Sequence, residues 1–337
     1  MAKRFFLIGF CICIALVVAP VKGEAATKTL KISYNVAQGS SWDKGAQFFK
    51  KYIEEKSEGR FKVETFPNAA LAQSNDRVEI EMAQSGVIDL LIKSTMWLPS
   101  LDNKFQTVML PFQFPNHDVA EKVMDGPAGD SLLELLPKHR LQGLAWGVNG
   151  FRQVTNSKKD IRSPADIKGL KVRVPGIELC LDIFKTMGAT PVSMSFAEVF
   201  PSLQTKTVDG QENPLSLIWS SRFFEAQEYC TLWNYMYDAI CFIASQKLWD
   251  SLSDSDKILF KEAAKAAMNH ERMVVREEDK TLVGELEKKG MKVTQLTDEE
   301  LKGFQDTLRP VYDEYKIKLS KDIVDVFEKE IAAASAN

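Results

Sequence analysis

The stretch that decides the fold reads GLKVRVP at residues 169–175 and SFAEVFPSLQTKTVDGQENP at residues 195–214. Charged and apolar residues alternate from Lys171 to Val174, which predicts a short strand with two distinct faces. Pro175 cannot donate a hydrogen bond to a neighbouring strand, so the strand ends there. Arg173 therefore lies one residue from a strand end, where α/β folds place their ligand crevice.

The second part of this stretch begins with a capping box, in which Ser195 and Glu198 satisfy each other's backbone donors at a helix start. A second strand begins near Val208 and runs into Asn213-Pro214. A permanent cation and a primary amide at two strand ends suggest a clamp for a carboxylate. The planar fork of Arg173 matches a carboxylate, and Asn213 adds a neutral donor.

The length of 337 residues predicts two domains, and the composition is ordinary for a globular protein, with 45% hydrophobic and 26% charged residues. Residues 1–25 differ from the rest, because Lys3 and Arg4 precede an apolar run from Phe5 to Ala19. This pattern predicts a secretory signal peptide that is cleaved after Ala25. A membrane anchor is the alternative, but a span needs roughly 20 apolar residues.

Removal of residues 1–25 leaves 40 Lys and Arg (43 minus 3) and 45 Asp and Glu (46 minus 1), a net charge of −5. This balance argues against nucleic acid as a partner, because no basic excess is available to neutralise phosphates. The remaining cysteines are Cys180, Cys230 and Cys241. They allow at most one disulfide, and three free core thiols are equally consistent with the sequence.

Strand and helix signals alternate along the first half of the chain, which predicts an α/β domain with parallel strands. Strands are expected near 30–34, 61–65, 87–92 and 141–148, and helices near 41–57, 75–85 and 119–139. A short strand carrying Arg152 opens a second α/β unit. A helix from about 254 to 289 has no stop signal before Gly290, and its length of roughly 54 Å suggests a spine across both domains.

Catalytic motifs are missing from the sequence. It holds three histidines, and it contains no zinc-protease, nucleophile-elbow or phosphate-loop pattern. No clustered ligands point to a metal ion, and no cofactor is expected. Arginines at strand ends instead favour a binding protein over an enzyme.

Several motifs resemble the substrate-binding proteins of TRAP (tripartite ATP-independent periplasmic) transporters, the DctP-type family. They are KGLKVRVP, MGATPVSMSFAEVF, VDGQENPL, GRFKVETFP at 59–67, LPF at 110–112, NGFRQ at 149–153 and RFFEAQ at 222–227. The resemblance implies a clamp like that of periplasmic binding proteins, with two α/β lobes joined by hinge strands and a long spanning helix. Lobe I would comprise 26–149 and about 238–278, and lobe II 150–237 and about 279–337, with the helix at about 254–289 spanning both.

The resemblance also assigns ligand-binding roles to individual residues. Arg173 would form the salt bridge to the ligand carboxylate, with Arg152 as a second arginine and Asn213 as a hydrogen-bonding amide. Phe196 would pack over the ligand, and Asn35 would make a polar contact from the first lobe.

The sequence departs from its relatives at Lys93-Ser94, where some sialic-acid binders carry a glutamate. This difference argues against sialic acid, and Lys93 could meet the far end of a dicarboxylate. Trp97, Phe196 and Trp219 could instead face the ring of a sugar acid such as a uronate. All four side chains could equally be structural, so the ligand and its first-lobe contacts stay open.

The resemblance implies a receptor that delivers a small organic acid anion to integral membrane permease subunits. The signal peptide predicts the periplasm of a Gram-negative bacterium, and we expect a monomer. The alternatives are the binding protein of an ABC-type importer or a periplasmic enzyme acting on an organic acid.

Overall fold

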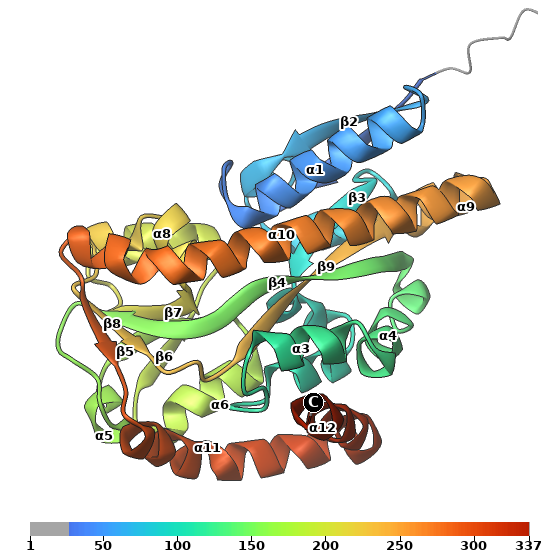
Figure 1. Ribbon diagram of the computed structural model, residues 1–337. Coiled ribbons are helices and arrows are strands. Elements are labelled where there is room, and N and C mark those ends of the chain that lie inside the picture. The colour runs from blue at the N-terminus through green and yellow to red at the C-terminus, as the bar shows by residue number, and fades with distance from the viewer. Residues whose placement is uncertain (1–26, 337) are drawn as a thin grey trace, which may run out of the picture.

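The computed structural model describes residues 27–336, so the predicted signal peptide lies outside the described residues. The strands form one mixed sheet in the order β2-β1-β3-β9-β4-β7-β5-β6, and β8 and β10 extend it from β4. Helices pack on the sheet, as Figure 1 shows. The predicted α/β fold class is confirmed. The strands divide into two lobes, which meet along β4 (Leu141–Asn156).

The first lobe contains β1, β2, β3, β9 and the first half of β4, and β1 pairs in parallel with both β2 and β3 as expected. Ser40 caps its first long helix. The third strand begins at Leu90, three residues later than predicted. The elements of this lobe are β1 (Lys28–Ser33), α1 (Ser41–Lys56), β2 (Phe61–Phe66), η1 (Pro67–Ala72), α2 (Asp76–Ser85), β3 (Leu90–Ser94), η2 (Thr95–Ser100), η3 (Asn103–Met109), α3 (His117–Met124), α4 (Pro127–Leu133), η4 (Pro137–His139), β9 (Tyr237–Ser245) and α9 (Gln246–Ser251).

The second lobe is built on the second half of β4, which pairs with β7 and β8. Strand β5, which carries Arg173, lies parallel to β6 and β7. The sequence did not predict α8, β8 or β10. The elements are α5 (Pro164–Ile167), β5 (Lys171–Val174), α6 (Glu178–Thr186), β6 (Thr190–Ser193), η5 (Phe196–Glu198), α7 (Val199–Gln204), β7 (Gly210–Pro214), α8 (Leu215–Ser220), η6 (Phe223–Glu225), β8 (Tyr229–Leu232) and β10 (Lys292–Gln295).

Strand β4 is continuous through both lobes, whereas the sequence suggested two separate strands. Its pairing with β9 shifts register between Val148 and Gly150. Gly150 has φ +123°, a backbone conformation that residues with a Cβ rarely adopt. The glycine therefore allows the strand to change direction without ending, and β4 joins the lobes directly.

Helix α10 (Asp254–Lys288) crosses both lobes (Figure 1). Ser253 caps its start, and Gly290 follows its end with φ +95°. Ala264 and Met268 pack into the core around α1, whereas Leu282 and Leu286 pack with α7 and β8. At 35 residues the helix is about 52 Å long, which agrees with the predicted spine.

The two C-terminal helices lead the chain from the second lobe back to the first. Helix α11 (Asp298–Lys318) packs on α6 of the second lobe. Helix α12 (Lys321–Ser335) packs on α3 and α4, and its Phe327 is buried in the core beneath them. The three cysteines of the described chain are buried and free.

Candidate functional site

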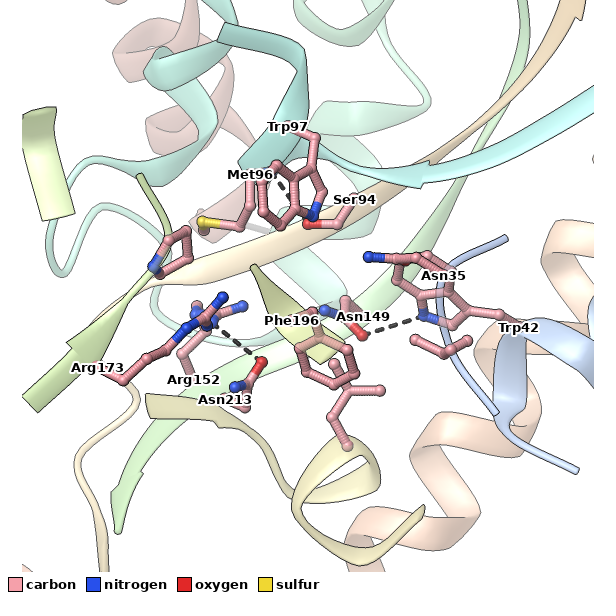
Figure 2. A pocket seen from close by; sticks show the side chains of 13 residues that line it. Asn35, Trp42, Ser94, Met96, Trp97, Asn149, Arg152, Arg173, Phe196 and Asn213 are labelled. Carbon is pink, nitrogen blue, oxygen red and sulfur yellow. Dashed lines mark hydrogen bonds between the residues drawn. The ribbon is translucent and has the colours of Figure 1, made fainter. Parts of the chain in front are cut away.

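A cavity of about 290 Å³ lies between the lobes, where β5, β7 and the middle of β4 meet the loop after β1. A larger pocket of about 790 Å³ shares Asn35 and Phe196 with it and also contacts Asp76; we call this space the outer pocket. Seven of the eight predicted site residues line the cavity, and Figure 2 shows them converging from both lobes. The seven are Asn35, Ser94, Trp97, Arg152, Arg173, Phe196 and Asn213.

Arg173 is the cation of the site that lacks a protein counter-ion. Its side chain is 1% exposed, and Nε and Nη2 donate to the Met194 carbonyl at 3.2 and 2.8 Å. Within residues 27–336 it forms no ion pair, and Nη1 makes no hydrogen bond. Burial lowers the pKa of Arg173 to about 10, so the guanidinium stays charged at neutral pH. A buried charge without a partner is costly, and an anion bound beside Arg173 would lower this cost.

Arg152 lines the same cavity, but protein carboxylates already surround it. It donates through Nε and Nη2 to the Glu212 carboxylate, and through Nη1 to Asp238 at 2.6 Å. Burial acts to lower the pKa of Arg152, but Glu212 and Asp238 outweigh it and raise the pKa. Arg152 is thus paired with protein carboxylates in the cavity wall rather than a free cation.

Asn213 lies beside Arg152 at the end of β7. Its Oδ1 accepts from Arg152 Nη2 at 3.1 Å, and its Nδ2 donates to Gln211 Oε1 at 2.5 Å. The amide orientation is fixed because a guanidinium can only donate. An amide nitrogen carries two hydrogens, so the second N–H of Asn213 remains available to a ligand near Arg173.

The first lobe contributes Asn35, whose Nδ2 donates to Asp76 Oδ1 at 2.5 Å. Since a carboxylate only accepts, the amide oxygen must point the other way. This Oδ1 is buried and has no hydrogen-bond partner among the described residues. Asn35 therefore presents an acceptor that a ligand donor can satisfy.

Lys93 does not line the cavity. Its Nζ contacts Asp76 Oδ1 at 2.6 Å and Glu79 Oε2 at 2.5 Å, and its side chain is fully buried. Burial acts to lower the pKa of Lys93, but the two carboxylates outweigh it and raise the pKa. The role considered for Lys93, meeting a second ligand carboxylate, finds no support in this position.

The aromatic candidates divide in a similar way. Phe196 and Trp97 line the cavity, and Lys93 Nζ lies 5.6 Å from the Trp97 ring centroid. Trp219 is absent from the lining of either pocket and packs against Phe224, with 5.2 Å between the ring centroids.

Sequence reasoning missed several lining residues. Trp42 Nε1 donates to Asn149 Oδ1 at 3.1 Å (Figure 2), and Asn149 Nδ2 donates to Asp238 at 2.6 Å. Asn149 begins the NGFRQ motif, so its position beside Arg152 was a usable signal. The others lie in α1, η2, α8 and two loops, without a distinctive sequence pattern: Val36, Trp42, Met96, Pro175 and Leu217.

The described part of the chain brings several binding groups together in this cavity. It contains no cluster of three or more metal-ligating side chains. Nor does any of its helices combine the length and apolarity needed to cross a membrane. The cavity presents a buried cation, an amide N–H and an amide oxygen, which suit a carboxylate that also carries a donor.

Comparison with known proteins gives one consistent family. A model of the family "Bacterial extracellular solute-binding protein, family 7" matches residues 32–318. The chain is 30% identical to the C4-dicarboxylate-binding protein DctB of Bacillus subtilis, over 87% of this chain and 84% of that protein.

Two solved structures resemble it closely. The sugar acid binding protein DctPAm from Advenella mimigardefordensis, in complex with galactonate, is 36% identical with a TM-score of 0.89, covering 92% of this chain and 100% of that one. A TRAP periplasmic solute-binding protein from Polaromonas, bound to D-erythronate, is 36% identical with a TM-score of 0.85, covering 89% and 98%.

Proposed function

The chain belongs to family 7 of the bacterial extracellular solute-binding proteins, the substrate-binding proteins of TRAP transporters, and on this premise we propose how it holds its ligand. The ligand is a small organic acid anion whose carboxylate docks on Arg173. The second N–H of Asn213 donates to the same carboxylate, and Phe196 packs over the ligand. Membership of this family favours a TRAP transporter over an ABC-type importer as the system that the protein serves.

The buried, unpaired guanidinium of Arg173 carries the proposal. Its Nη1 makes no hydrogen bond within the described chain, although Arg173 is 1% exposed and lines the cavity. A ligand carboxylate would supply both the missing counter-ion and the missing acceptors. Because the surroundings exclude water, this charge pair is stronger than it would be on the surface.

Two features support a clamp that closes on the ligand. Strand β4 joins the lobes through the irregular pairing at Gly150, and α10 crosses both. The proposed division assigns 26–149 and about 238–278 to lobe I, and 150–237 and about 279–337 to lobe II. Within the last segment, α12 packs on helices of the first lobe. Closure brings Asn35 toward a ligand already held by Arg173.

The receptor acts in the periplasm as a monomer and passes its ligand unchanged to the membrane permease. The cavity lining supports binding without turnover, since its polar groups are held by one another rather than poised as an acid and a base.

A thermal-shift screen tests this function. The mature protein is mixed with sugar acids, hydroxy acids, keto acids and dicarboxylates, and hits are measured by calorimetry. At least one organic acid should raise the unfolding temperature and be recovered unchanged after incubation. An absence of any hit among these acids, or conversion of a hit into product, would contradict the proposal.

A further inference from the structure

The charges around the cavity identify how many anionic groups the ligand can carry. Three buried cations lie in or beside the site: Arg152, Arg173 and Lys93. Arg152 contacts two carboxylates and Lys93 contacts two others. Within residues 27–336, Arg173 is the one of the three that has no ion pair. The site therefore has a counter-ion for one ligand carboxylate.

The wall opposite Arg173 is negative rather than positive. Lys93 contributes +1, and Asp76 and Glu79 contribute −1 each, so this buried cluster carries a net charge of −1. Asp76 Oδ1 accepts from both Lys93 and Asn35, whereas its Oδ2 accepts no hydrogen bond from the described residues. Asp76 also lines the outer pocket. A second ligand carboxylate at this end would face an uncompensated negative charge.

The hydrogen-bonding groups at this end are acceptors. Asn35 Oδ1 is buried without a partner, and its orientation is fixed by the hydrogen bond from Nδ2 to Asp76. A hydroxyl can donate to an amide oxygen or a carboxylate, whereas an ionised carboxylate cannot donate. Leaving buried acceptors unpaired costs free energy, so hydroxyl groups at the far end of the ligand match these atoms and a carboxylate does not.

Resting on the proposed function, we propose that the ligand is a monoanionic polyhydroxy acid, such as an aldonate, and that the Lys93–Asp76–Glu79 cluster excludes dicarboxylates. The carboxylate of the ligand binds Arg173, and its hydroxyls donate to Asn35 Oδ1 and toward Asp76. Lys93 acts as a positioning residue: it holds Asp76 and Glu79 in place without cancelling their combined charge.

Matched ligand pairs test this inference directly. Erythronate and meso-tartrate differ only in a terminal hydroxymethyl group that becomes a carboxylate, and galactonate and galactarate differ in the same way. Calorimetry on the wild-type protein should show that an aldonate binds more tightly than its matched diacid, by on the order of tenfold or more. Equal or tighter binding of the diacid would overturn the inference.

The Asp76→Asn variant makes the same test from the protein side. It brings the net charge of the cluster to zero, so the preference for the aldonate over the diacid should shrink several-fold. Glu81→Gln on the same helix is the control, because Glu81 is exposed and pairs with Arg77. An unchanged preference in Asp76→Asn, with the fold verified by circular dichroism, would contradict the role of the cluster. If the variant does not fold, calorimetry of the matched ligand pairs on the wild-type protein decides the inference alone.

Failure of this inference is distinguishable from failure of the proposed function. Binding of succinate, meso-tartrate or galactarate without binding of either aldonate would overturn the inference and leave a carboxylate receptor. If no acid of the whole screen binds, both are overturned.

Discussion

The guanidinium of Arg173 donates twice to the backbone carbonyl of Met194, through Nε at 3.2 Å and Nη2 at 2.8 Å. This contact fixes the plane of the guanidinium without neutralising its charge. Arg173 is therefore oriented before a ligand arrives, and pre-orientation lowers the entropy lost on binding.

Arg152 should contribute mainly to stability. Its replacement by Met leaves Glu212 and Asp238 buried without their cation, which should lower the free energy of unfolding by about 3–5 kcal/mol. Urea unfolding measures this loss. Arg162→Met is the matched control, since Arg162 pairs with Asp160 at the surface and such pairs contribute about 0–1 kcal/mol. Similar losses in the two variants would contradict the buried network.

Gly150 should be sensitive to a small substitution. Gly150→Ala forces an unfavourable φ and places a Cβ 3.1 Å from Pro214 Cβ, so it should destabilise the protein by about 1–3 kcal/mol. Gly284→Ala in α10 is the control, because a Cβ there meets no atom within 4 Å. That change should be neutral or stabilising by up to about 1 kcal/mol. Urea unfolding that ranks the two variants in the opposite order would rule out this role for Gly150.

Glu271 should make stability depend on pH. It lies in α10 and accepts from the backbone N–H of Val148 at 3.0 Å, and burial raises its pKa from 4.5 to about 8. A raised pKa means that the folded protein holds a proton that the unfolded chain releases. The contribution of Glu271 to the free energy of unfolding is therefore fully present below about pH 4.5 and is lost as the pH rises toward 8.

Glu271→Gln keeps an acceptor for Val148 and removes the titration. Relative to wild type, the variant should gain stability as the pH rises from 5 to 8, by a few kcal/mol at most, since one pKa unit corresponds to about 1.4 kcal/mol. Urea unfolding at several pH values measures the difference in unfolding free energy between variant and wild type. The contributions of all other titrating groups cancel in this difference. A difference that stays constant over this range would show that Glu271 titrates normally.

The sequence predicted the features that depend on local patterns. The strand carrying Arg173, the capping box at Ser195 and the long helix ending before Gly290 all follow from alternation, caps and stop signals within a few residues. The Asn213 strand was found for the same reason.

Features that depend on distant partners were not predictable in this way. Lys93 resembled a free cation because Asp76 and Glu79 lie on a separate helix, and only folding brings the three together. Strand β4 resembled two strands because Gly150 is a usual break signal. The pairing of Arg152 likewise depends on Glu212 in β7 and Asp238 in β9, which follow it by 60 and 86 residues.

The central claim, that Arg173 binds the ligand carboxylate, is tested most directly by calorimetry on Arg173→Ala with the best acid from the screen. Arg162→Ala serves as the surface control. The account predicts that Arg173→Ala loses about 3–5 kcal/mol of binding free energy, some hundreds- to thousands-fold in affinity, while remaining folded. Binding of the same acid by Arg173→Ala as tightly as by wild type would contradict it.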